Sequence, residues 1–503
     1  MFDLVLKNGL ILDGSGKEGY VADIAVKDGK IAAIGKDLGE SAETLDVTGL
    51  AVSPGWIDSH SHSDNAIPAF PDMKEKIEQG ITMSVTGQCG GSAAPSKTYS
   101  SEAFMAEMTQ MPFGSGAVML VGHNTLRRRV MQEEKRDPTP AELEEMKRLL
   151  AEAMDAGAIG MSFGLYYVPG CYSKTEEAIA LAKVVAEKGG LLAAHIRNES
   201  DKLEEAVAEY LEIVKQSGCR AVISHHKAGG KENWGKVKKT LQMVDKANAE
   251  GSDIYVDVYP YIASHTSLKS RFIPSKFHPE GTTNAVKLLE DPEFCQRLKA
   301  WSIAQWGEEK IDWCLITISP KMRELEGMKL YQAAEYLGFT DQFDAIYHML
   351  RITNGALNGC FFSMCEEDVE YVMAHPRAMI CTDSGVAMNA AKFHPRLRAS
   401  FPRALGRYAR ERQVVSIPEM IRKMTSLPAA VYGMHHKGHL AVGYDADLCV
   451  FDPETICETN DYVHCELPNE GLAYVVVDGK IVVKDGVYNG VRAARLYRKA
   501  DLS

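Results

Sequence analysis

The sequence lacks long apolar runs and an excess of basic residues. No stretch approaches the ~18 apolar residues that a membrane span needs, and charged residues interrupt the apolar segment 1–10, so no signal peptide is predicted. The formal net charge is −12, which argues against nucleic acid or a membrane surface as the main partner. The 503 residues are instead enough for one large α/β domain with a smaller domain beside it.

Paired cysteine spacing is also missing. The 11 cysteines are scattered and odd in number, which, without a secretion signal, favours free thiols in a reducing cytoplasm. One of them, Cys89, lies in TGQCGGS (86–92), directly after an apolar run that is typical of a buried strand. Since a disulfide is not expected there, Cys89 is core filler, a nucleophile or a metal ligand.

The two ends of the chain carry the same pattern. Asp-Gly pairs at 28–29 and 478–479 each lie between alternating apolar runs, which predicts tight hairpins. We expect a small β-sandwich domain built from residues 1–54 and 430–503, because chain ends often meet. The alternative is two unrelated hairpins.

Eight short apolar runs alternate with helical patterns in the middle of the chain. This alternation is typical of a parallel sheet covered on both faces, and eight strands predict an α/β fold, a TIM-like (β/α)8 barrel, over residues 55–429. An open doubly wound sheet is the alternative. The runs are 56–60, 81–86, 117–122, 158–163, 191–195, 221–225, 253–259 and 378–383.

A long interval separates the seventh and eighth runs. Residues 260–377 are far more than a single helix would fill, and segments 284–300 and 328–352 have helical patterns. We therefore expect a helical insertion at about 264–350 that covers a pocket.

Potential metal ligands follow five of the eight predicted strands. In a (β/α)8 barrel the carboxyl ends of the strands carry the active site, and histidine, cysteine and aspartate are the ligand types that bind zinc. A single His-x-His pair is weak evidence, but five strand ends with such residues favour a metal site over packing. The candidate ligands are His60, His62, Cys89, His195, His225 and Asp383.

Several motifs, taken together and in order, resemble a known family. The segment VSPGWIDSHSHSD, preceded by LVLKNGLILDGSG, resembles the amidohydrolase superfamily. Within that superfamily the chain is similar to the N-acyl-D-amino-acid deacylases (D-aminoacylases) over nearly its whole length. The motifs that carry this closer likeness are TGQCGGS, AAHIRNES, ISHHKAGG, DVYPY, CTDSG and HPRLRASFPRALGRY.

The resemblance implies a zinc centre bridged by a cysteine. Most related hydrolases bridge two metals with a carboxylated lysine on strand four, and the run 158–163 contains no lysine. Carried over to this sequence, Cys89, His195 and His225 hold the tight zinc. A second site, weaker or empty, combines the shared Cys89 with His60, His62 and Asp383. A thiolate suits this role because it can bridge two ions.

The resemblance also implies the reaction. Water activated by zinc attacks the amide of a small N-acyl-D-amino acid, and Asp383 acts as general base and acid, releasing a carboxylate and a free D-amino acid. Lys227, Tyr259 and Arg396 match the residues that bind the substrate carboxylate, although Tyr261 competes with Tyr259 for that role. The D preference rests on the resemblance alone.

Other functions remain open at this stage. The strand-four segment GMSFG contains a Gly-x-Ser-x-Gly pattern, but a Pro-Gly pair rather than a helix follows it, which disfavours Ser162 as a nucleophile. Hydrolysis of a cyclic amide, as in dihydroorotase- or hydantoinase-like enzymes, is disfavoured by the missing lysine. A non-catalytic scaffold is disfavoured because no ligand is missing. Lys269 and Arg271 lead to the hypothesis of an acidic substrate side chain, and the sequence gives no oligomeric state.

Overall fold

A barrel of parallel strands forms the centre of the molecule. The computed structural model describes residues 1–282, 284–386 and 392–503. Eight strands form one sheet in the order β16-β12-β11-β10-β9-β8-β7-β6, and every neighbouring pair is parallel. The strands are β6 (Trp56–Asp58), β7 (Ile81–Thr86), β8 (Gly116–Gly122), β9 (Gly160–Gly164), β10 (Leu191–His195), β11 (Arg220–Ile223), β12 (Ile254–Val258) and β16 (Ala378–Ile380). Every predicted run overlaps one of these strands, which confirms the predicted barrel.

The barrel closes between β6 and β16, just beyond the ends of these two short strands. The backbone N–H of Asp383 donates to the carbonyl of His60 at 3.0 Å, and Ser61 pairs with Ser384 in a parallel bridge. This closure excludes the open doubly wound sheet, and it brings the polar residues after strands one and eight side by side.

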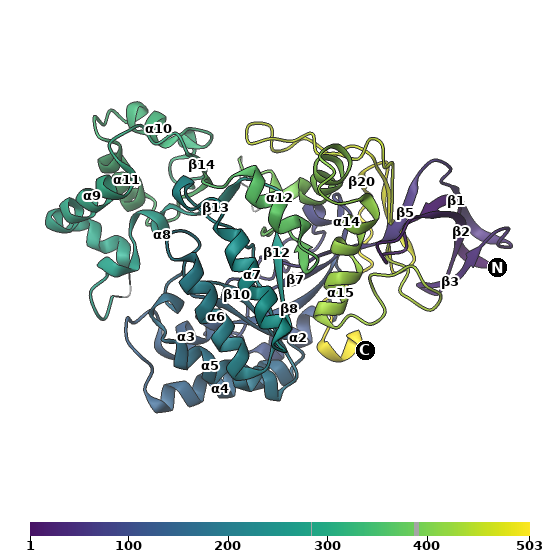
Figure 1. Ribbon diagram of the computed structural model, residues 1–503, viewed down its shortest axis with the longest axis horizontal. Helices are drawn as coiled ribbons and strands as arrows, with labels where there is room; N and C mark the ends of the chain where they lie inside the picture. The colour runs from purple at the N-terminus through teal and green to yellow at the C-terminus, as the bar shows by residue number, and fades with distance from the viewer. Residues whose placement is uncertain (283, 387–391) are drawn as a thin grey trace.

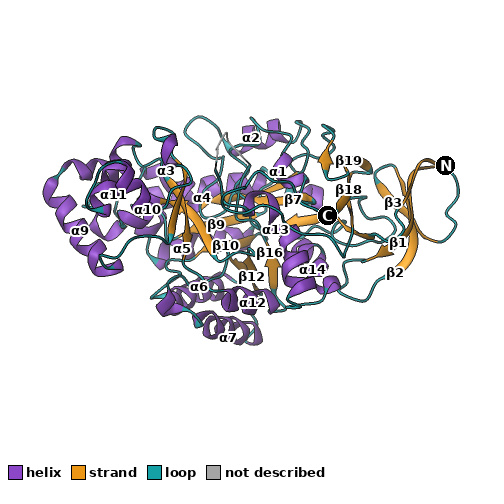
Figure 2. Cartoon of the chain, turned by 90° about the horizontal axis from the view of Figure 1, so that it is seen from above, coloured by secondary structure: helices purple, strands orange, loops and turns teal. Residues whose placement is uncertain are grey.

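Helices surround the barrel (Figures 1 and 2). They are α1 (Lys74–Ile77), α2 (Ser101–Met108), α3 (His123–Met131), α4 (Pro140–Asp155), α5 (Thr175–Glu187), α6 (Leu203–Ser217), α7 (Lys236–Ala249), α12 (Glu366–Ala374), α13 (Arg396–Arg403), α14 (Ile417–Met424) and α15 (Ser426–Tyr432). Local sequence explains their ends: Thr139 caps α4 in a capping box with Glu142, and Gly218, at φ 72°, ends α6.

The insertion between the seventh and eighth barrel strands has an apolar core of its own, which includes Leu298, Phe343 and Phe361. It is helical, as predicted, but it also contains a three-stranded antiparallel sheet in the order β13-β15-β14. The sequence did not predict this sheet, because segments such as ASHTS are short and largely polar. The elements are β13 (Ala263–Ser267), α8 (Leu268–Phe272), α9 (Pro292–Trp306), β14 (Cys314–Ile318), α10 (Leu330–Tyr336), α11 (Gln342–Ile352) and β15 (Asn358–Phe362).

Strands from both chain ends form one nine-stranded sheet, at the end of the molecule opposite the insertion (Figure 1). The predicted hairpins are β2/β3 and β18/β19, and their turns are linked because Ala446 donates its N–H to the Gly29 carbonyl and accepts the Gly479 N–H. The strands are β1 (Phe2–Ile11), β2 (Tyr20–Lys27), β3 (Lys30–Gly35), β4 (Ser41–Asp46), β5 (Ala51–Pro54), β17 (Leu448–Phe451), β18 (Leu472–Val477), β19 (Lys480–Lys484) and β20 (Val487–Tyr488). The two hairpins are therefore parts of one structure, while the domain boundaries stay a prediction.

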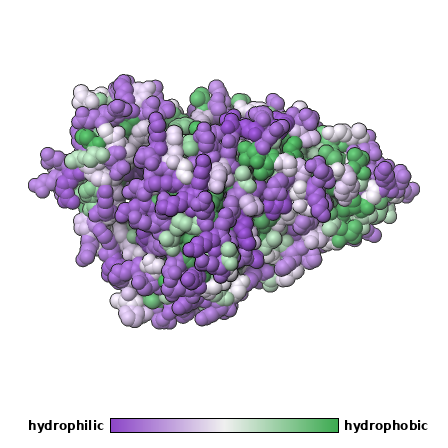
Figure 3. Space-filling model, viewed as in Figure 1, coloured by the Kyte–Doolittle hydropathy of each residue, from purple (hydrophilic) through white to green (hydrophobic). Residues whose placement is uncertain are grey.

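Hydrophilic residues cover most of the face seen in Figure 3. Hydrophobic residues are more frequent at the end formed by the terminal sheet (Figures 1 and 3), and the exposed apolar side chains of this region include Val21 and Val487, at 59% and 61%. In the described parts of the chain, no helix is both long enough and apolar enough to cross a membrane.

Candidate metal centre

The thiol of Cys89 lies at the centre of the predicted ligands. Its Sγ is 3.2 Å from Nε2 of His225, 3.4 Å from Nε2 of His60 and 3.7 Å from Nδ1 of His195. These histidines follow or end three different strands, and each turns a ring nitrogen toward the sulfur. The ligand atoms of Cys89, His195 and His225 all lie within 4.8 Å of one another, as the ligands of a single ion must.

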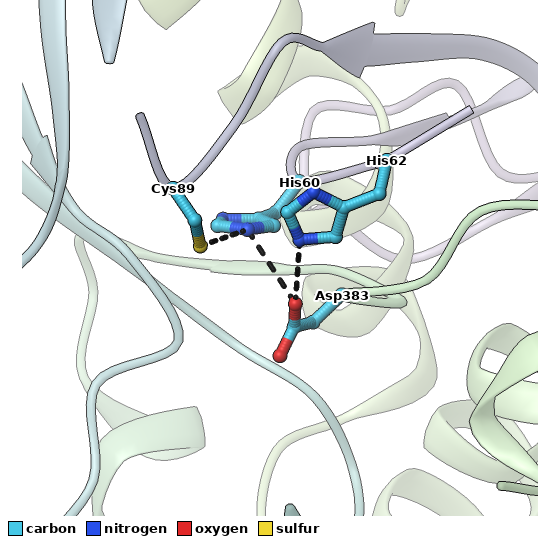
Figure 4. A group of neighbouring side chains, drawn as sticks. All are labelled: His60, His62, Cys89 and Asp383. Atoms are coloured by element: carbon cyan, nitrogen blue, oxygen red, sulfur yellow. Dashed lines mark hydrogen bonds and ion pairs between the residues drawn. The ribbon is translucent and has the colours of Figure 1, made fainter. Parts of the chain in front are cut away.

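A second group shares the same thiol (Figure 4). The ligand atoms of His60, His62, Cys89 and Asp383 also lie within 4.8 Å of one another. Oδ1 of Asp383 is 3.0 Å from Nε2 of His62 and 3.6 Å from Nε2 of His60. The structure therefore brings all six predicted ligands together, in two groups joined by one sulfur.

A tight loop presents the thiol. Gly87, Cys89 and Gly90 have φ values of 75°, 52° and 75°, and a left-handed conformation is costly for a residue other than glycine. Ser162, fully buried on β9, holds this loop because its Oγ accepts the Gly90 N–H at 3.0 Å and donates to the carbonyl of Gly87. The hydroxyl of Ser162 is thus engaged in loop geometry, which agrees with the expectation that it is no nucleophile.

The charges in the cluster support one another. Burial raises the pKa of the Cys89 thiol, but His60 and His225 outweigh it and hold that pKa well below its usual range. Burial and Lys227 lower the pKa of His225, but Glu199 and Cys89 outweigh them and raise it to about 9. A cysteine thiolate, histidine imidazoles and an aspartate carboxylate are the ligand types that bind zinc in proteins. The residues therefore fit a zinc ion.

Two of the three predicted carboxylate-binding residues reach the cavity. Nη1 of Arg396 is 2.7 Å from Oδ2 of Asp383, and both Arg396 and Lys227 line the cavity wall. Tyr259 is 2% exposed and lies behind them, with the guanidinium of Arg396 4.7 Å and the amine of Lys227 5.6 Å from its ring centre. Its competitor Tyr261 packs instead against Arg403.

The cavity lies between the barrel mouth and the insertion. Its volume is about 930 Å³, at the upper end of the range for small-molecule sites. The barrel contributes five of the six proposed metal ligands to the wall, all but the fully buried His60. The insertion contributes residues that include His265, Lys269 and Arg271. The predicted pocket beneath the insertion is therefore present, with the cluster at one side of it.

Glu199 is a site residue that the sequence did not single out. Its Oε1 is 2.9 Å from Nδ1 of His225 and 2.7 Å from Nζ of Lys227, and its Oε2 is 3.4 Å from Nε2 of His195. Burial raises the pKa of Glu199, but His195, Lys227 and His225 hold it below its usual range. The available signal was its place in AAHIRNES, four residues after a predicted ligand.

Lys76 was also missed. Its amine is fully buried and donates to Asp58 Oδ2 at 2.9 Å, to Thr382 Oγ1 at 2.7 Å and to the Ser384 carbonyl at 2.8 Å. Asp58 in turn accepts the N–H of Thr382 at 2.8 Å. This network joins α1, β6 and the segment after β16, and it fixes Thr382 and Ser384, the two residues on either side of Asp383.

Comparison with known proteins places this geometry in a family. The amidohydrolase family model matches residues 43–308 and 375–483. The chain is 35% identical to an N-acyl-D-glutamate deacylase of Alcaligenes xylosoxydans xylosoxydans, covering 95% of this chain and 93% of that protein. It is also 35% identical to a D-aminoacylase of the same organism, covering 98% and 97%.

Solved structures agree with the sequence relatives. The structure of N-acyl-D-glutamate deacylase from Bordetella bronchiseptica, complexed with zinc and a phosphonate mimic of the tetrahedral intermediate, matches with a TM-score of 0.86 at 34% identity and 99% coverage of both chains. A D-aminoacylase structure matches with a TM-score of 0.86 at 32% identity, covering 99% of this chain and 100% of the other. Hydantoinase structures share the fold, with TM-scores of 0.56 to 0.58 at 15–19% identity. The chain thus belongs to the amidohydrolase family and, within it, to the N-acyl-D-amino-acid deacylase (D-aminoacylase) family.

Proposed function

We propose that this protein hydrolyses the amide bond of N-acyl-D-amino acids with the help of zinc, releasing a carboxylate and a free D-amino acid. The observation that carries the proposal is the thiol-centred cluster of six ligands, with Arg396 and Lys227 beside it in one cavity. The D-aminoacylase relatives support the same chemistry. The cyclic-amide alternative has weaker support, because the likeness to hydantoinases reaches only the fold.

The proposed metal ligands form two sites, which correspond to the two groups of neighbouring side chains in the structure. Cys89, His195 and His225 would hold a tight zinc, and His60, His62 and Asp383 would share Cys89 in a second, weaker site. Zinc bound there supplies Lewis acidity, which lowers the pKa of water toward ~7 and polarises an amide carbonyl. A related D-aminoacylase of known structure has a binuclear centre in which one metal activates and the second attenuates, which supports unequal sites here.

Asp383 is the proposed general base and acid. It would take a proton from the attacking water and deliver it to the leaving amine. Burial raises the pKa of Asp383, but Arg396, His225 and His62 outweigh it and hold that pKa well below its usual range. The carboxylate is therefore ionised and ready to accept a proton at neutral pH.

Arg396 and Lys227 are the proposed contacts of the substrate carboxylate. Both are cations at the cavity wall, and charge-assisted hydrogen bonds to a carboxylate are among the stronger polar contacts. Tyr259 would support them from behind, because its buried ring lies between the two cations. Binding of substrate would draw Arg396 from Asp383, freeing one carboxylate oxygen for proton transfer.

Lys269 and Arg271 favour an acidic side chain on the substrate. Both line the cavity, and no ion pair holds either of them among the residues that the structure describes. Nε of Arg271 is buried without a hydrogen-bond partner in the same part of the chain. Of the relatives, one is an N-acyl-D-glutamate deacylase, which supports the same preference. Faster turnover of N-acetyl-D-Leu than of N-acetyl-D-Glu, unchanged in Arg271→Ala, would contradict it.

The test of the function pairs metal analysis with a substrate screen. Purified protein is assayed for zinc and for release of amino acid from N-acetyl and N-formyl derivatives in both D and L forms, with hydantoins included. We expect tightly bound zinc and turnover of D substrates. Turnover confined to L substrates or to cyclic amides, or full activity after removal of metal, would refute the proposal.

A further inference from the structure

Glu199 contacts the outer nitrogens of two proposed zinc ligands. His195 turns Nδ1 toward the Cys89 sulfur and Nε2 toward Oε2 of Glu199. His225 does the reverse, with Nε2 toward the sulfur and Nδ1 toward Oε1 of Glu199. One carboxylate thus binds both rings on the side away from the thiol, with one oxygen for each ring.

This arrangement favours a proton on the outer side of each ring, because a carboxylate oxygen can only accept hydrogen bonds. Nδ1 of His225 also lies 2.8 Å from the amine of Lys227, and Oε1 of Glu199, 2.9 Å from that nitrogen and 2.7 Å from the amine, can accept a hydrogen bond from both. With its proton on the outer nitrogen, each ring can direct the lone pair of its other nitrogen at a metal, which is the form that binds one. The two rings are turned in opposite senses, but the effect of Glu199 is the same, because its carboxylate faces the outer nitrogen of each ring.

The same carboxylate also holds a substrate contact. Nζ of Lys227 is 2.7 Å from Oε1 of Glu199 and 2.9 Å from the carbonyl of His225. The side chain of Glu199 is 16% exposed and that of Lys227 12%, and a buried charge of this kind is tolerated because it is paired and hydrogen-bonded. Glu199 is therefore the common support of the tight metal group and of the cation beside it.

We propose that Glu199 is a positioning residue, which sets the tautomers of His195 and His225 for metal binding and holds Lys227 at the cavity wall. The inference rests on the proposed function insofar as it takes these two histidines as zinc ligands. Glu199 also lines the cavity, and the role proposed for it is exerted through the three residues that it orients.

The experiment compares the zinc affinity of Glu199→Gln and Glu199→Ala with that of the wild type, by competition with a chelator. Glutamine has the same size but one acceptor oxygen, so it satisfies only one of the two rings. We expect zinc affinity to fall about 10-fold in Glu199→Gln and nearer 100-fold in Glu199→Ala, the usual range for the loss of such a support. With Co²⁺ in place of zinc, the thiolate absorption band is expected to shift in both variants. Activity of Glu199→Gln is expected to recover in excess zinc, with KM remaining above the wild-type value because Lys227 has lost its partner.

Glu209→Gln is the matched control. Glu209 is a carboxylate of the same 16% side-chain exposure and it is also paired, but with Arg197 and with no histidine. We expect it to leave zinc affinity and the Co²⁺ spectrum unchanged. Wild-type affinity in both Glu199 variants, or an equal loss in Glu209→Gln, would overturn the proposal. Absence of zinc from the wild type would overturn the metal site and this inference together. The two proposals can also fail separately. If the wild type bound zinc but cleaved no N-acyl-D-amino acid, and the Glu199 variants lost zinc, the role of Glu199 would be supported and the proposed substrate refuted.

Discussion

The two halves of the metal cluster are built differently. In the first half, the outer nitrogens of His195 and His225 both face Glu199, and both inner nitrogens face the Cys89 sulfur. The carboxylate of Glu199 also accepts a hydrogen bond from Lys227, so two rings and one amine share it on the outer side. This half is preorganised, because its ligands already have the orientation that a bound ion requires.

The second half has competing partners. Asp383 lies 3.0 Å from His62 through Oδ1 and 2.7 Å from Arg396 through Oδ2. Nδ1 of His60 makes no hydrogen bond to any described residue, and its nearest carboxylate, Asp257, is 3.7 Å away. A carboxylate shared in this way binds metal less firmly but can exchange protons. The comparison teaches that one half is suited to holding an ion and the other to moving a proton.

Removal of the shared thiol should break both halves. We expect Cys89→Ala to lose tight zinc by more than about a hundredfold and to lose measurable hydrolysis, because the sulfur is the only ligand common to the two groups. Cys219→Ala is the control, since that cysteine is buried and its thiol donates to a backbone carbonyl outside the cluster. Metal analysis and an activity assay measure the two losses. A Cys89 variant that kept both tight zinc and hydrolysis would show that this residue only packs in the core.

Removal of the carboxylate should separate the halves. Asp383→Asn keeps the shape but cannot accept a proton, so we expect kcat to fall by about 10²–10⁴-fold while tight zinc is retained. His62→Gln serves as the comparison, because it removes a second-half ligand without removing the base. If Asp383→Asn released the tight zinc, the distinction drawn between the halves would be wrong.

The buried pair beneath the second half offers a test of stability. In Lys76→Met, Asp58 is left as an uncompensated buried charge, which costs about 3–5 kcal/mol of unfolding free energy. Urea denaturation measures this loss, and the double variant Lys76→Met/Asp58→Asn should recover part of it. We expect zinc to remain bound in the folded variant, since the first half does not touch Lys76. If Lys76→Met unfolded with the same free energy as the wild type, the buried ion pair would not stabilise the closed barrel.

The smallest expected effect is a change in pH dependence. Burial raises the pKa of Asp383, and Arg396 is the strongest of the groups that lower it. In Arg396→Gln the carboxylate loses this support, so it protonates at higher pH and the acidic limb of kcat/KM moves upward. Lys227→Gln should raise KM without moving that limb. If the acidic limb moved equally in both variants, Arg396 would not be the cation that specifically lowers the pKa of Asp383.

The barrel and its ligands were predictable because both leave local signals. Each barrel strand is an apolar run of its own, and a ligand such as His195 or Cys89 ends its run or follows it within three residues. Parallel strands bring their carboxyl ends together, so the placement of the ligands in one cluster follows from the strand order.

The supports of the cluster left no such signal. Lys76 meets Thr382 across 306 positions of sequence, and only the closed barrel shows that they touch. Glu199 lies four residues after a predicted ligand, but in the sequence its carboxylate resembles an ordinary surface charge, and only the structure shows that both rings face it. The sheet in the insertion was missed for another reason, since its strands have five residues each and no apolar alternation.

The closure of the barrel also orders events during folding. The first half and its support precede the insertion in the chain, on β10 or in the segments after β7, β10 and β11, and comprise Cys89, His195, Glu199 and His225. Asp383 and Arg396 follow the insertion. Contacts between distant segments form late, because the chain entropy of the intervening residues must be lost first. We expect a growing or refolding chain to assemble its metal-holding half first, and to become a hydrolase only when the last strand docks against the first.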